Sequence, residues 1–133
     1  MLYQDFIEKK VALRAAFKDM RKAGLMARMN YMCCQNCAGY AMTTEAVKRI
    51  DAGTPQEDIK GCVFYHNQDN ANLERDRKFY LAYGNMDSTE YGTIGLPTET
   101  VGQIVVEILD KYDIKTEWDG NASSRIFVDL EAK

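Results

Sequence analysis

The sequence alternates between helical and strand hydrophobic patterns joined by short connections, and this order restricts the fold more than any other feature. Residues 2–23 form an amphipathic helix pattern that Gly24 can end. A further helix is expected between Cys34 and Ala52, most securely from Thr43 or Thr44, either of which can cap it. The clearest helix follows Pro97, and its apolar positions have the spacing of one helical face: Val101, Ile104, Val105, Ile108, Leu109 and Tyr112.

Five segments have strand patterns, at residues 25–32, 60–66, 78–83, 114–118 and 125–130. The polar segment 67–77 is read as a connection in which Asp69 caps a short helical turn, and residues 84–96 as a surface loop. Neighbouring strands with short connections favour antiparallel pairing. We therefore predict a single α+β domain over residues 1–133, with a mainly antiparallel five-stranded sheet and about three helices packed on one of its faces.

Charge and apolar composition argue against nucleic acid and membranes as binding partners. The net charge is -3, the pI is about 5.2, and the charges of both signs are interspersed, so no basic stripe points to nucleic acid. No apolar run approaches the ~20 residues that span a bilayer, and the first residues carry charges where a signal peptide has its apolar core. We expect a cytoplasmic protein that binds neither nucleic acid nor membranes.

Three of the four cysteines, Cys33, Cys34 and Cys37, fall within five positions after the first predicted strand. The fourth, Cys62, lies in the segment C-V-F-Y-H-N-Q-D together with the only histidine, His66. In a reducing compartment, clustered cysteines are more often metal ligands, reactive thiols or core residues than structural disulfides.

A zinc site is possible, with Cys33, Cys34, Cys37, Cys62 and His66 as the available ligands. The pattern lacks a second C-x-x-C or C-x-x-H pair. In addition, adjacent residues on a strand point to opposite faces, so Cys33 and Cys34 can bind one ion only if the chain turns between them.

Two other interpretations use the thiols chemically. Cys34 and Cys37 form a C-x-x-C pair that can act as a reversible dithiol, although Pro55 and Pro97 do not suit the cis-proline of a thioredoxin fold. Alternatively, Cys34 or Cys37 is a nucleophile with His66 as its base.

A base of this kind would be oriented by Asn67 or Asp69. In the simplest interpretation Cys33 and Cys62 are core residues and His66 is a hydrogen-bonded residue at the end of a strand.

Four motifs in order, C-C-Q-N-C-A-G-Y, V-F-Y-H-N-Q-D, F-Y-L-A-Y-G and E-W-D-G, resemble those of a family of small bacterial proteins, domain of unknown function 6891. This sequence has Ala38 where that family tends to have glycine. The resemblance implies no activity, but it draws attention to polar residues without an evident packing role. The matching positions are Cys33, Cys34, Gln35, Cys37, Tyr65, His66, Gln68, Asp69, Tyr80, Tyr83, Gly84, Trp118, Asp119 and Gly120.

We predict that a small molecule or a protein partner binds where the loop after the first strand meets the end of the second. The predicted ligand-binding residues are Cys34, Gln35, Cys37, His66, Gln68 and Asp69. The alternatives are a thiol enzyme or redox protein, a structural zinc site, and a pure protein-interaction domain.

Overall fold

The computed structural model describes residues 1–132, and four α-helices and seven strands follow one another within them. The first half contains α1 (Tyr3–Lys22), β1 (Leu25–Arg28), α2 (Gln35–Asp51), the 3-10 turn η1 (Gln56–Asp58), β2 (Gly61–Phe64) and α3 (Asn67–Asp76). The second half contains β3 (Lys78–Gly84), β4 (Met86–Ser88), β5 (Gly92–Ile94), α4 (Thr98–Lys111), β6 (Lys115–Glu117) and β7 (Ile126–Asp129).

The main sheet has the strand order β1-β2-β3-β7-β6. Only β1 and β2 pair in parallel, because α2 carries the chain back between them, and the other neighbours are antiparallel. The predicted α+β fold with a mainly antiparallel five-stranded sheet is confirmed. No helix among residues 1–132 is long and apolar enough to cross a membrane.

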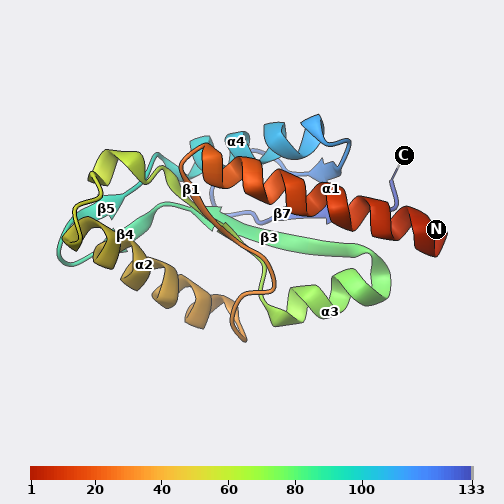
Figure 1. Ribbon diagram of the computed structural model, residues 1–133, viewed down its shortest axis with the longest axis horizontal. Coiled ribbons are helices and arrows are strands. Elements are labelled where there is room, and N and C mark those ends of the chain that lie inside the picture. The colour runs from red at the N-terminus through yellow and green to blue at the C-terminus, as the bar shows by residue number, and fades with distance from the viewer. Residues whose placement is uncertain (133) are drawn as a thin grey trace.

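Helices cover both faces of this sheet, which corrects the expectation of a single covered face. Figure 1 shows α1 and α4 on one side and α2 on the other. The alternation along β1 explains the arrangement, because Leu25 and Ala27 face the α1 side while Met26 packs with Met42 of α2. Both faces of β1 and β2 are apolar, so each needs a covering layer.

The end of the first strand and the start of the second helix also differ from the sequence prediction. The first strand ends at Arg28 and not at Met32, because Asn30 and Met32 have the left-handed φ values of 49° and 65°. The second helix begins at Gln35, so Thr43 and Thr44 lie inside it. Their hydroxyls donate to carbonyls four residues earlier instead of capping the helix.

The two predicted loops contain regular structure. Residues 84–96 include the β4–β5 hairpin, which packs Met86 and Ile94 against the α2 side of the core. Residues 67–76 form the ten-residue helix α3, with Leu73 buried, where only a short turn was expected. Asp69 is not its cap but its third residue, since His66 occupies the cap position.

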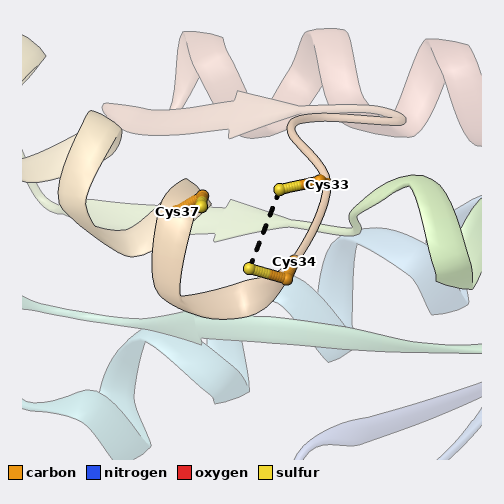
Figure 2. Close-up of side chains that lie close together, drawn as sticks. All are labelled: Cys33, Cys34 and Cys37. Atoms are coloured by element: carbon orange, nitrogen blue, oxygen red, sulfur yellow. Dashed lines mark hydrogen bonds between the residues drawn. The ribbon is translucent and has the colours of Figure 1, made fainter.

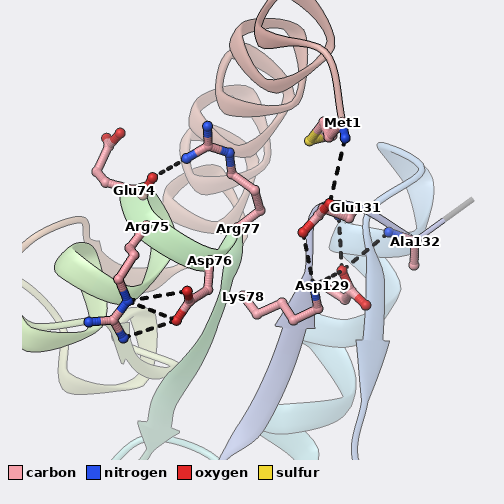
Figure 3. Close-up of polar contacts among 9 residues, drawn as sticks. All are labelled: Met1, Glu74, Arg75, Asp76, Arg77, Lys78, Asp129, Glu131 and Ala132. Atoms are coloured by element: carbon pink, nitrogen blue, oxygen red, sulfur yellow. Dashed lines mark hydrogen bonds and ion pairs between the residues drawn. The ribbon is translucent and has the colours of Figure 1, made fainter.

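Charged side chains meet where β3 begins beside the end of β7 (Figure 3). Lys78 contacts Glu131 at 2.9 Å, and Glu131 also lies 3.8 Å from the amino group of Met1. Solvent screens ion pairs as exposed as these and leaves them little net stabilisation, so the apolar layers hold the fold together.

Candidate functional site: a cysteine cluster at the start of helix α2

Backbone hydrogen bonds join the cysteine loop to the end of β2. The N–H of Tyr31 donates to the carbonyl of Tyr65 at 2.8 Å, and the N–H of Asn67 donates to the carbonyl of Met32 at 2.9 Å. The two segments that the sequence analysis placed together are therefore neighbours, because both follow the same ends of two paired parallel strands.

The three clustered cysteines bring their sulfur atoms together at the N-terminus of α2 (Figure 2). Cys33 Sγ lies 3.9 Å from Cys34 Sγ, and all three sulfurs lie within 4.8 Å of one another. Cys34 is the N-cap residue of α2, and Cys37 lies on its first turn. Cys33 and Cys34 are outside a strand, so the bend of the chain allows both sulfurs to reach the same side.

All three clustered thiols are exposed to solvent, which corrects the interpretation of Cys33 as a core residue. Cys62 is buried, as expected, and burial raises the pKa of its thiol to about 12. Cys62 faces the interior between α2 and the sheet and does not belong to the group of close sulfurs.

The start of α2 distinguishes the thiols of Cys34 and Cys37. The backbone N–H of Cys37 is the main cause that lowers the pKa of Cys34, followed by the thiols of Cys37 and Cys33. The N–H of Asn36 adds to this effect, although the Cys34 sulfur makes no regular cap hydrogen bond. Hydrogen bonding with Cys33 and then Cys34 raises the pKa of the Cys37 thiol to about 11.

His66 and Asp69 form a capping box at the start of α3. His66 Nδ1 accepts from the N–H of Asp69 at 3.4 Å, and Asp69 Oδ2 accepts from the N–H of His66 at 3.3 Å. His66 Nε2 also lies 3.2 Å from Asp69 Oδ2. Within residues 1–132, one group of three or more His, Cys, Asp or Glu side chains has its ligand atoms within 4.8 Å of one another, and it consists of the three clustered cysteines. His66 does not belong to this group.

Arg125 completes the environment of Asp69, and the sequence analysis did not single it out. Asp69 is only 2% exposed, and Arg125 Nη2 contacts its Oδ2 at 2.7 Å. The same nitrogen donates to the carbonyl of Tyr80 at 3.0 Å, while Arg125 Nε is buried without a hydrogen-bond partner in the described chain. The one signal in the sequence is a charged residue directly before the apolar start of a strand.

The predicted ligand-binding residues therefore occupy two different environments. Cys34 and Cys37 belong to the sulfur cluster, with Gln35 exposed between them. His66 and Asp69 stabilise the start of α3, and Gln68 is exposed on its first turn.

Trp118, from the E-W-D-G motif, lies on the face of the sheet opposite to α2. Trp118 Nε1 donates to the hydroxyl of Tyr83 at 2.7 Å, and both rings pack on the α1 and α4 side of the core. These two residues are thus separated by the sheet from α2, whose N-terminus carries the cysteines.

Comparison with known proteins gives one match. The model of the family described as "Domain of unknown function (DUF6891)" matches residues 11–133. No curated protein and no solved structure matches the chain.

Proposed function

Because the chain belongs to the DUF6891 family, whose description states no activity, we propose a function from its own geometry: it binds one zinc ion through the thiolates of Cys33, Cys34 and Cys37. The observation that carries this proposal is the mutual approach of the three sulfurs within 4.8 Å. Zinc is the ion of choice for three neighbouring thiolates in a protein that needs no redox change at the metal.

The spacing of the sulfurs supports zinc. A zinc–sulfur bond of about 2.3 Å and tetrahedral angles require sulfurs about 3.8 Å apart. The distance between the sulfurs of Cys33 and Cys34, 3.9 Å, is already close to this value. The other separations do not exceed 4.8 Å, so small side-chain rotations of exposed residues bring all three sulfurs to bonding distance.

The charge of the complex also suits its position. Three thiolates around a divalent cation carry one net negative charge, and the N-terminus of α2 presents unpaired N–H groups that favour such a charge. The ion therefore draws stabilisation from the helix as well as from its ligands.

The fourth coordination position faces solvent, since the three cysteines are exposed and His66 is held at the cap of α3. A water molecule or a small external ligand fills it in this proposal. Zinc with three protein ligands and one exchangeable position differs from the closed four-ligand sites that only stabilise a fold. The expected small-molecule binding at this loop then takes place at the metal.

Metal titration of the reduced protein tests the proposal. Cobalt replaces zinc in thiolate sites and gives charge-transfer absorption whose intensity reports the number of thiolates, and competition with zinc yields the zinc affinity. We expect one ion per chain, bound in the wild type and at least about tenfold more weakly in Cys33→Ser, Cys34→Ser and Cys37→Ser.

Two variants serve as matched controls. Cys62→Ala removes a cysteine outside the cluster, and His66→Asn keeps a side chain that caps helices well. Both are expected to bind one ion with wild-type affinity. The proposal is wrong if the three serine variants bind zinc as tightly as the wild type, or if the wild type retains no ion.

A further inference from the structure

We propose that the same cluster also reacts with hydroperoxides, and that Cys34 and Cys37 then form a disulfide that releases the zinc ion. The oxidation concerns the metal-free thiols and stands independently of zinc binding, whereas the release step rests on the proposed function. Among residues 1–132 this is the one place where three or more ligand atoms of His, Cys, Asp or Glu lie within 4.8 Å of one another, and all three cysteines are exposed.

The position of Cys34 makes it the attacking sulfur. Its side chain is exposed, so a peroxide can reach it, and it lies at the N-cap of α2 with both other sulfurs within 4.8 Å. The N–H groups of the first helical turn stabilise negative charge at this place during the attack.

The chemistry is balanced with a hydroperoxide as the only oxidant. The Cys34 thiolate attacks one peroxide oxygen and the O–O bond breaks. The departing alkoxide or hydroxide takes a proton from the solvent, so the products are a sulfenic acid and an alcohol or water. The Cys37 thiol then attacks the Cys34 sulfur, and its proton leaves with the hydroxyl group as water. The two sulfurs are oxidised, and the peroxide is reduced.

The chain geometry selects Cys37 as the partner of Cys34. Residues three apart at the start of a helix lie close enough for a disulfide after a small rotation. A disulfide between the adjacent residues Cys33 and Cys34 would close a small ring through their peptide bond and strain its planarity. Cys33 is therefore expected to remain a thiol, although its sulfur lies only 3.9 Å from that of Cys34.

Loss of two ligands explains the release of the ion. A disulfide sulfur is a poor zinc ligand because zinc binds the thiolate form. After oxidation only Cys33 remains as a ligand, and one exposed thiolate does not retain zinc. Reduction of the disulfide restores the site, so the cluster would couple zinc binding to the supply of peroxide.

The experiment uses the reduced, chelator-treated chain mixed with one equivalent of hydrogen peroxide, then denatured and alkylated. Before alkylation we expect the mass to be lower by that of two hydrogens, and alkylation should then modify only two of the four thiols. Trypsin leaves all three cysteines on residues 29–48, so fragmentation of that peptide locates the bond. Cys33→Ser should still form the Cys34–Cys37 disulfide, and Cys62→Ala, outside the cluster, should form it at the wild-type rate. Cys34→Ser and Cys37→Ser should form no intramolecular disulfide.

The outcomes separate this inference from the proposed function. A disulfide that uses Cys33, or a wild type that accumulates only sulfinic acid at Cys34, overturns the oxidation. Zinc-loaded protein that forms the Cys34–Cys37 disulfide but keeps its ion, measured with a chromogenic chelator, overturns the release. A chain that never binds zinc yet forms this disulfide refutes the proposed function and leaves the peroxide reaction standing.

Discussion

The backbone N–H of Asn67 donates a 2.9 Å hydrogen bond to the carbonyl of Met32 and so fixes the cysteine loop to the start of α3. Met32 has a left-handed φ of 65° and directly precedes Cys33. Because Asn67 is the first residue of α3, the same bond links the position of the cysteines to the helix that His66 caps.

Removal of this donor should loosen the cluster without breaking α3. Proline is well tolerated at the first residue of a helix, and His66 already has the extended backbone that a following proline requires. Asn67→Pro is expected to lower the free energy of unfolding by about 1 kcal/mol and to weaken zinc binding. Asn67→Ala keeps the N–H and is the control. Equal zinc affinities in the two variants, measured by competition titration, would show that the bond does not position the cluster.

The contact between Arg125 and Asp69 should matter far more for stability than exposed ion pairs. Arg125→Met leaves a carboxylate that is 2% exposed without its cation, at an expected cost of about 2–4 kcal/mol in urea unfolding. Arg75→Met, which removes an exposed contact with Asp76, should leave the free energy of unfolding almost unchanged. The double variant Asp69→Asn with Arg125→Met should recover part of the loss, and an additive loss would contradict a coupled pair.

Alkylation of the metal-free protein should distinguish the thiols by pH. The pKa of Cys34 is lowered and that of Cys37 is raised to about 11, so Cys34 has the larger thiolate fraction of the two at neutral pH and should react first. Raising the pH toward 11 should close the gap as Cys37 ionises. Cys62, with a pKa of about 12 and a buried side chain, should react only on unfolding. Mass spectrometry of peptides from brief iodoacetamide pulses measures these rates, and faster labelling of Cys37 than of Cys34 at pH 7 would refute the assignment.

Two helical glycines should respond oppositely to alanine. A Cβ on Gly102 of α4 would lie 2.7 Å from Trp118 and 2.8 Å from Tyr83, so Gly102→Ala is expected to cost about 1–3 kcal/mol. Apart from its chain neighbours and the backbone of its own helix, Gly39 of α2 has no heavy atom within 4 Å of such a Cβ. Gly39→Ala should therefore raise stability by about 0.5–1 kcal/mol. Thermal unfolding of both variants tests the packing, and an unchanged stability in Gly102→Ala would mean that the two rings move aside easily.

Local patterns predicted most of the elements of the fold. The helix after Pro97 and the strands around Phe79 and Val128 have strong periodicity, and their residues occupy the expected elements. The segment after Leu25 was more ambiguous, because left-handed residues at Asn30 and Met32 end the strand without a glycine to signal them. The β4–β5 hairpin was missed because its three-residue strands are too short for periodicity to register.

The sequence by itself determined that three thiols lie at the junction of a strand and a helix and that His66 follows the next strand. Only the tertiary structure decided which of these groups act together. His66 and Asp69 satisfy backbone groups at the start of α3, and Asp69 is paired with Arg125, 56 positions away. Such pairings depend on which strands become neighbours and on the direction of each side chain. The spacing of residues in the sequence shows neither the strand neighbours nor the side-chain directions. The sulfur cluster could be anticipated because its three cysteines lie within five consecutive positions.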